Sequence, residues 1–201
     1  MNYSSNEILF ALGLTIFAGL STGIGSFLGL ASRKYNPRFL AGALGFSAGV
    51  MIYVSFIEIL PKAQDSLALV YSDKMAQLLT VVSFFVGIAI IAFIDFLIPE
   101  YENPHEIKNI SSSKMEAKNK DKLMRMGLFS ALAIAIHNFP EGLATFLSGL
   151  NDPAAGLGIA VAIAIHNIPE GIAVTVPIYY ATKKRGKAFW YSFSSGLAEP
   201  I

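Results

Sequence analysis

Two copies of one short phrase organise this chain: HNFPEG at residues 137–142 and HNIPEG at residues 166–171. Each copy lies in the middle of a long apolar stretch, where a histidine, an asparagine and a glutamate are unexpected. A charged side chain at the centre of a bilayer costs about 2.5–3.5 kcal/mol even on the insertion scale, so such residues mark functional positions by default. The doubled phrase therefore marks the site around which we expect the rest of the chain to be built.

The composition is typical of a membrane protein, because 54% of the 201 residues are hydrophobic and only 14% are charged. A soluble domain carries about 25% charged residues. The charges lie between apolar runs longer than about 18 residues, the length that indicates a membrane-crossing helix. The net charge of +1 gives no general attraction to nucleic acid, so we expect no nucleic-acid partner. The absence of cysteine excludes disulfides and thiolate metal sites.

We predict an all-α fold, a single polytopic bundle of transmembrane helices. The predicted spans are residues 8–31, 39–60, 76–98, 123–150, 154–181 and 188–201. Pro61 is predicted to end the second span, since a proline disfavours helix at the residue before it. The hydrophilic stretch 100–122 is predicted to be a linker, because it has too little apolar surface to fold alone. The sixth span has only about 13 of the roughly 20 residues that a crossing needs, so we expect the sequence to be a fragment of a longer protein.

Positive charge is distributed unevenly among the connecting segments. All of the 15 Lys and Arg residues except Lys62 and Lys74 lie in or beside the first, third and fifth connections. Positively charged loops remain on the cytoplasmic side of a membrane. The sequence therefore predicts an N-terminus outside the cell and a cytoplasmic linker at 100–122.

Within each phrase the histidine and the glutamate are four residues apart. On a helix such residues share one face and lie about 6 Å apart along the axis. His137 and Glu141 can therefore reach one ion, and so can His166 and Glu170.

Each phrase also contains a proline, Pro140 in the first copy and Pro169 in the second. Proline has no N–H, so each helix is predicted to kink and to free a backbone carbonyl beside its histidine. Consecutive spans cross in opposite directions, so both phrases reach the same depth, as in transporters that bind their substrate at the membrane midplane. We therefore expect the site between the kinked helices 123–150 and 154–181.

The side chains of the doubled phrase suit a divalent transition-metal ion. Imidazole, carboxylate and the amides of Asn138 and Asn167 together favour Zn²⁺, Fe²⁺, Mn²⁺, Co²⁺ or Cd²⁺. Calcium and magnesium prefer cages made of oxygen ligands alone. The alternative is a hydrogen-bonded network that only joins helices, but the repetition of the whole His-Asn-Glu set favours a metal.

Three further side chains within the predicted spans bear on the site. Met51 offers a thioether, although a methionine there is more often a packing residue. Glu58, near the outer end of its span, is either a carboxylate that admits the metal or an acid that reaches the interface. Glu199 falls near the depth of Glu141 and Glu170, so we expect it to take part in the site.

At these residues the sequence resembles the ZIP family of divalent metal transporters, and most closely its bacterial ZupT-like branch, whose fourth and fifth helices carry HNxPEG. The similarity extends to GFSAGVMIYVSFIEILP at residues 45–61 and to SGLAEP at residues 195–200. The resemblance implies eight helices with an outside N-terminus in a bacterial plasma membrane. Its last two helices are not in this sequence.

The resemblance also implies a site for two metal ions. One position would use Met51, His137, Glu141, His166 and Glu170. The other would use Asn138, Asn167 and Glu199, with Glu141 and Glu170 bridging. The implied partners are the lipid bilayer and the transported divalent metal; no resident cofactor is expected, and a homodimer is left open.

Three functions compete at this stage. The first is uptake of divalent metal into the cytoplasm by alternating access, without enzymatic activity. The second is an intramembrane metal-dependent hydrolase, which needs a metal-activated water and a general base; the HExxH phrase of zinc proteases is absent. The third is a receptor or scaffold with a structural metal, in which replacing Glu141 by alanine should unfold the protein.

Overall fold

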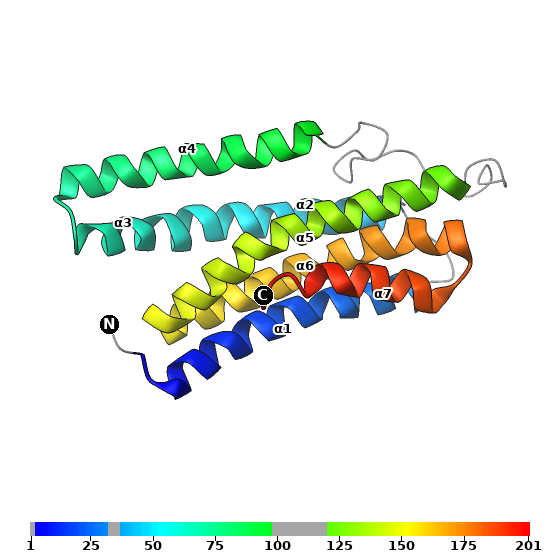
Figure 1. Cartoon of the computed structure of the whole chain (residues 1–201), viewed down its shortest axis with the longest axis horizontal. Coiled ribbons are helices and arrows are strands. Elements are labelled where there is room, and N and C mark those ends of the chain that lie inside the picture. Colours follow the sequence, from blue (N-terminus) through cyan, green and yellow to red (C-terminus); the bar gives the residue numbers. More distant parts are fainter. Residues whose placement is uncertain (1–2, 32–36, 98–119) are drawn as a thin grey trace.

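The computed structural model describes residues 3–31, 37–97 and 120–201, and all the regular secondary structure in these ranges is helical. The elements are α1 (Ser5–Ala31), α2 (Pro37–Tyr53), the π-helical segment η1 (Val54–Ile59), α3 (Leu60–Ala68), α4 (Asp73–Leu97), α5 (Lys120–Asn151), α6 (Pro153–Thr182) and α7 (Arg185–Gly196). Because α2, η1 and α3 follow one another without a break, the described chain forms six rods (Figure 1). The predicted all-α class is confirmed.

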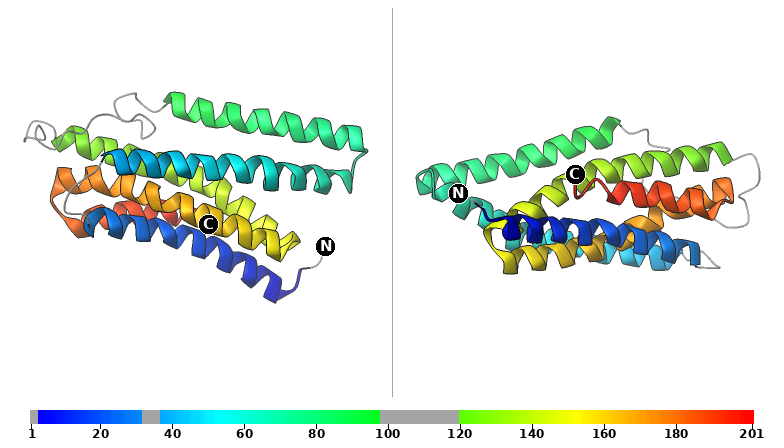
Figure 2. Two further views of the ribbon diagram at one scale, coloured as in Figure 1. Left: turned by 180° about the vertical axis from the view of Figure 1, so that it is seen from behind. Right: turned by 60° about the horizontal axis from the view of Figure 1, so that its bottom comes forward.

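Helices α1, α5, α6 and α7 form a four-helix bundle in which α6 contacts each of the other three. The continuous rod of α2, η1 and α3 packs beside this bundle, with α2 against α6. Helix α4 returns along α3 at the outer edge of the molecule, away from α1 (Figures 1 and 2). The two helices that carry the repeated phrase, α5 and α6, are therefore both part of the central bundle.

Close packing in the bundle depends on small residues at the helix contacts. A Cβ added to Gly25 of α1 would overlap the backbone of Ile168, and a Cβ on Gly171 of α6 would overlap the carbonyl of Thr22. Small residues allow helix backbones to approach closely, which is how helices associate in lipid. The glycines thus let α1 lie directly against the part of α6 that carries the second phrase.

Within the part of the chain that the structure describes, four helical stretches are long and apolar enough to cross a membrane: Ser5–Ala31, Arg38–Ala68, Asp73–Ile94 and Pro153–Thr182. Helix α5 has 32 residues, which is ample length for a crossing. Its first turns carry charged residues and its centre carries the polar phrase, which lower its mean hydropathy. That α5 and α7 also enter the membrane stays a prediction.

The prediction that Pro61 ends the second span is wrong, because the helix continues to Ala68. The six residues Val54–Ile59 adopt the wider π-helical form, and α3 begins directly after them with Pro61 in its first turn. A proline is tolerated in the first turn of an α-helix, where its missing N–H needs no partner within the helix. The π segment therefore lets the rod pass through the proline.

The last predicted span also differs from the structure. Helix α7 begins at Arg185, earlier than expected, and ends at Gly196 instead of running to residue 201. Residues 197–200 form turns, consistent with the bias against helix at the residue before Pro200. The other predicted spans start and stop within a few residues of α1, α4, α5 and α6. The predicted linker 100–122 lies outside the described residues up to residue 119.

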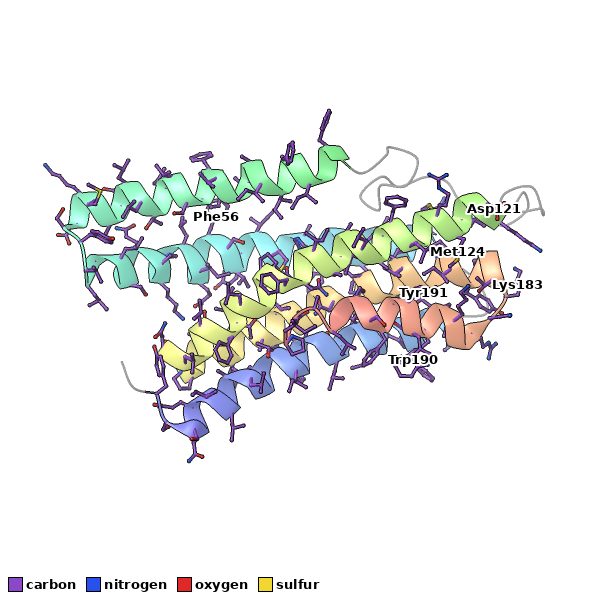
Figure 3. The ribbon with its side chains drawn as sticks, viewed as in Figure 1. Phe56, Asp121, Met124, Lys183, Trp190 and Tyr191 are labelled. Atoms are coloured by element: carbon purple, nitrogen blue, oxygen red, sulfur yellow. The ribbon has the colours of Figure 1, made fainter. Side chains whose placement is uncertain are left out.

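One end of the bundle carries basic and aromatic side chains, where α5 begins and α6 passes into α7 (Figure 3). Lys183, which ends α6 in a left-handed conformation with φ 56°, places its ammonium 4.7 Å from the ring centre of Tyr180. Lys187 lies 5.6 Å from the ring centre of Tyr191, and Trp190 is exposed beside it. Aromatic and basic side chains of this kind gather at membrane interfaces.

Candidate metal centre

Helices α5 and α6 bring the two phrases face to face. Nε2 of His137 lies 3.2 Å from Oε1 of Glu141, and Nε2 of His166 lies 3.0 Å from Oε1 of Glu170. These are the two pairs that the four-residue spacing predicted. Oε1 of Glu141 is also 3.7 Å from Nε2 of His166, and the two imidazole centres are 5.8 Å apart. The two phrases therefore form one cluster and not two separate ones.

Three residues of this cluster present ligand atoms close enough to share an ion. One ligand atom each from His137, His166 and Glu170 lies within 4.8 Å of the other two. Bonds from zinc to nitrogen or oxygen are about 2.0–2.2 Å long, so these atoms need to move little to surround one ion. The two histidines differ in solvent exposure: the side chain of His137 is 41% exposed, whereas that of His166 is 12% exposed. The cluster is therefore most accessible beside His137.

A second group of polar side chains lies deeper in the bundle. Asn138, Asn167 and Glu199 are buried. The amide of Asn167 donates to Oε1 of Glu199 and to the carbonyl of Ala18, the latter at 3.0 Å. The amide of Asn138 donates to the carbonyl of Ser195 at 3.4 Å. In both asparagines the amide nitrogen thus donates hydrogen bonds within the bundle, whereas the side-chain oxygen has no hydrogen-bond partner among the described residues.

Glu199 reaches this group because the chain turns after α7. Gly142 of α5 lies against the backbone of Glu199, and a Cβ on Gly142 would overlap the Glu199 carbonyl. The glycine that closes the first phrase therefore admits the turn that carries the third carboxylate. The early end of α7 and this close contact together place Glu199 beside Asn167.

Several buried polar atoms at the site have no hydrogen-bond partner among the described residues. Oxygens or nitrogens without a hydrogen-bond partner are Asn138 Oδ1, Glu141 Oε1 and Oε2, His166 Nε2, Asn167 Oδ1, Glu170 Oε2 and Glu199 Oε2. The glutamates and histidines are within ion-pair distance, but their atoms are not aligned for hydrogen bonds. Roughly 90% or more of buried backbone polar groups, and most buried side-chain polar atoms, have a partner, and leaving a charged one unpaired is costly. A cluster of orphaned oxygens with imidazole nitrogen is what a cation would satisfy.

Met51 and Glu58 were also predicted to bear on the site, and the structure places each of them in a different environment. Met51 packs against a buried apolar cluster of α1, η1 and α6 that includes Ala18, Val54 and Ile163. This contact is the packing role that was one of its two interpretations, and its role as a ligand stays a proposal.

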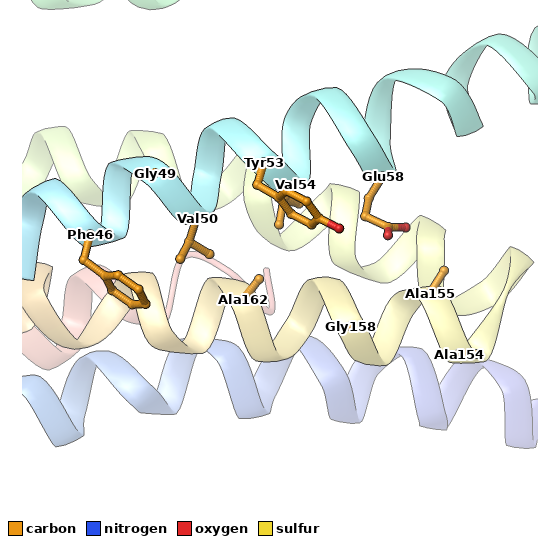
Figure 4. Close-up of a pocket in the computed structure, with 10 residues that line it drawn as sticks. All are labelled: Phe46, Gly49, Val50, Tyr53, Val54, Glu58, Ala154, Ala155, Gly158 and Ala162. Carbon is orange, nitrogen blue, oxygen red and sulfur yellow. The ribbon is translucent and has the colours of Figure 1, made fainter.

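Glu58 lies at the edge of a groove between the α2–η1 rod and α6. The groove has a volume of about 510 Å³, and Figure 4 shows Tyr53 and Glu58 facing it from one side and the small residues Ala155 and Ala162 from the other. Oε2 of Glu58 forms an ion pair with Lys62 at 3.3 Å. The structure therefore places Glu58 in a half-exposed charged group and not in the histidine cluster.

Lys62 also lies 3.7 Å from Oδ2 of Asp152, which caps the start of α6. The Asp152 carboxylate accepts from the backbone N–H groups of Ala154 and Ala155, each at 3.1 Å. The hydrogen bond from Ala155, helped by the charge of Lys62, lowers the pKa of Asp152 below its usual range. These contacts join the first turn of α3 to the start of α6.

Sequence reasoning missed one residue that touches the site, Ser47 of α2. Its Oγ lies 2.5 Å from Nδ1 of His166, and the serine is 1% exposed. Its position could have suggested a role, because Ser47 is four residues before Met51 and therefore on the same face of the helix.

Comparison with known proteins identifies the family. The sequence model described as ZIP zinc transporter matches residues 98–201. The zinc transporter ZupT of Chlorobium chlorochromatii is 62% identical over 199 residues, which cover 98% of this chain and 74% of that protein. The chain belongs to the ZIP zinc transporter family. ZupT proteins of Chlorobaculum parvum and Oceanobacillus iheyensis are 64% and 57% identical, again over 98% of this chain and 74% of each relative.

Membership in the ZIP family decides several of the predictions. ZIP proteins are transporters and not enzymes, so the chain is a divalent metal transporter and the hydrolase alternative is not favoured. With its apolar helices, this ZIP protein is a multi-pass membrane protein whose partners are lipid and metal ions.

Proposed function

We propose that this ZIP protein carries zinc into the cytoplasm of a bacterial cell, and that Fe²⁺, Mn²⁺, Co²⁺ and Cd²⁺ can use the same route. The observation that carries the proposal is the contact of Glu141 with His166 across α5 and α6, in a buried site full of unpaired acceptors. The name of the relatives, zinc transporter, supports zinc as the first substrate.

The proposed site holds two ions in adjoining positions. The first would be ligated by Met51, His137, Glu141, His166 and Glu170. The second would be ligated by the oxygens of Asn138, Asn167 and Glu199, with Glu141 and Glu170 shared. Support comes from the burial of the three carboxylates and the two asparagines and from the unpaired second oxygen that each carboxylate retains.

The donor set also supports a transported ion over a permanently bound one. Nitrogen and oxygen ligands bind borderline first-row cations, and the lack of thiolates leaves the affinity moderate enough for release. The ion exchanges its hydration shell for fixed carboxylates and amides on the way in.

The proposed direction is from outside to inside by alternating access, with the N-terminus outside and the inner bacterial membrane as the location. The uneven distribution of Lys and Arg supports this orientation. The aromatic and basic end around Lys183 and Trp190 would then face the cytoplasm.

The test is metal uptake by the full-length protein in sealed proteoliposomes. The wild type should accumulate zinc, and His137→Ala/His166→Ala should not. The matched control is His105→Ala, which removes the third histidine, in the predicted linker. Equal uptake by the wild type and the double variant would reject the site. Hydrolysis of lipid or peptide without uptake would restore the enzyme alternative.

A further inference from the structure

The two histidines of the cluster differ in what holds their second ring nitrogen. Nε2 of His166 faces the carboxylates of Glu170 and Glu141, at 3.0 and 3.7 Å. Nδ1 of His166 lies on the opposite edge of the ring, 2.5 Å from Oγ of Ser47. Among the described residues, Nδ1 of His137 has no such partner.

Ser47 is well placed to hold the ring. It lies on α2 and is 1% exposed, and α2 packs against α6. Its hydroxyl also lies 3.3 Å from the backbone carbonyl of His166 and donates to it. A hydroxyl both donates and accepts. With its hydrogen directed to the carbonyl, the serine oxygen is left to accept a hydrogen bond from Nδ1–H.

That arrangement decides which nitrogen of His166 can bind metal. In a neutral imidazole one nitrogen carries the proton and the other keeps a lone pair. If Nδ1–H donates to Ser47, the lone pair is on Nε2, which faces the carboxylates. Nε2 lies 3.0 Å from Oε1 of Glu170 without an aligned hydrogen bond, so a cation bound at this nitrogen would be shared with the carboxylates.

We propose that Ser47 is a positioning residue, which fixes the ring and the tautomer of His166 so that Nε2 is presented to the metal. The inference rests on the proposed metal site and adds a residue from a third helix to it. Hydrogen-bond partners of metal-binding histidines set tautomer and orientation, and their loss typically weakens metal affinity or activity about 10–100-fold.

The test compares Ser47→Ala, Ser47→Thr and the wild type as full-length proteins. Ser47→Ala removes a single oxygen and should weaken zinc binding and uptake by about 10–100-fold. Ser47→Thr retains the hydroxyl and should restore most of the affinity. The matched control is Ser26→Ala, which removes another buried serine hydroxyl, bonded across helices to Ser192 at 2.7 Å. It should leave zinc affinity unchanged.

Two backgrounds separate positioning from packing. In a His166→Ala background, Ser47→Ala should cause no further loss, because the residue acts through that ring. In a His137→Ala background, Ser47→Ala should still weaken zinc binding. Equal losses in both backgrounds, or zinc binding by Ser47→Ala as tight as that of the wild type, would overturn the proposal.

Nitrogen-15 NMR of the zinc-loaded protein gives a readout that does not depend on transport. The His166 ring should show a protonated Nδ1 in the wild type and in Ser47→Thr, and a mixture of tautomers in Ser47→Ala. A wild type with protonated Nδ1 that carries no zinc would refute the proposed function and leave the positioning intact. Protonated Nε2 in the wild type would refute the positioning alone.

Discussion

Oε1 of Glu141 on α5 lies 3.7 Å from Nε2 of His166 on α6, and this contact joins the two copies of the repeated phrase. Within each copy the histidine reaches its own glutamate, at 3.2 Å in the first and 3.0 Å in the second. The cross-helix contact adds a link that helix geometry within one copy cannot supply. Among these three carboxylate–imidazole contacts, only the one made by Glu141 to His166 links α5 to α6.

Replacing Glu141 by glutamine should stop transport while the protein still folds. The amide keeps the shape of the side chain but lacks the charge that binds a cation. We expect zinc uptake to fall by at least the roughly 10–100-fold caused by loss of a supporting hydrogen bond, because the proposed site has Glu141 as a direct ligand of the ion. Proteoliposome uptake and size-exclusion chromatography measure the two properties. If chromatography shows instead that the variant is unfolded, a structural role for the metal would be favoured over transport.

The contact of α1 with α6 should not tolerate a methyl group at Gly25. An added Cβ would overlap the backbone of Ile168, which cannot rotate away as a side chain can. We expect Gly25→Ala to destabilise the protein by about 1–3 kcal/mol, as overpacking does. Gly13→Ala on the same helix meets open space and is the control; alanine there should be neutral or stabilising. Thermal unfolding in detergent compares them, and equal melting temperatures would contradict the packing.

Zinc should protect the protein against unfolding, whereas magnesium should not. An ion that binds only the folded state adds about 2.7 kcal/mol at a concentration 100 times its dissociation constant. The imidazole ligands favour zinc over magnesium, which prefers oxygen. We expect the zinc-induced rise in melting temperature to disappear in His137→Ala/His166→Ala. A similar rise with both metals would point to nonspecific binding at surface carboxylates.

The contact between Asp152 and the start of α6 predicts a pH dependence. The backbone N–H of Ala155 and the charge of Lys62 lower the pKa of Asp152 in the folded protein. A carboxyl group of lowered pKa stabilises the fold above its unfolded pKa, and the contribution is lost as the pH falls through the folded pKa. Asp152→Asn keeps the helix cap but not the charge. It should melt slightly below the wild type at neutral pH.

The difference in melting temperature between Asp152→Asn and the wild type should shrink as the pH falls below the ordinary aspartate value of about 3.9. Lys62→Met should reproduce part of the difference at neutral pH, because it removes the ion pair with Asp152, together with the one to Glu58, and leaves the cap. A difference that is constant from neutral to acidic pH would show that the carboxylate charge contributes nothing.

Much of the fold follows from local sequence, because apolar runs and four-residue spacing act within one helix. The pairs His137–Glu141 and His166–Glu170 were predictable for that reason. The passage of the helix through Pro61 was not, because a π-helical segment has no strong sequence signal and resets the hydrogen-bond pattern before the proline.

Contacts between helices were harder to predict than contacts within them. The bond from Ser47 to His166 joins α2 to α6 and depends on how the rods pack, which one sequence does not specify. The sequence predicted a similar membrane depth for Glu199 and the glutamates of the two phrases. Its place beside Asn167 depends on two further features: α7 ends at Gly196, and Gly142 has no side chain to block the turn that follows. Local chemistry thus predicted the candidate ligands, and helix packing determined which residues lie beside them.

The most direct test of a shared ion is an anomalous difference map from crystals of the protein grown with zinc. The account predicts a zinc peak between α5 and α6, about 2.0–2.1 Å from Nε2 of both His137 and His166. A map in which zinc binds only one of the two histidines, or lies outside the bundle while the wild type still transports zinc, would contradict it.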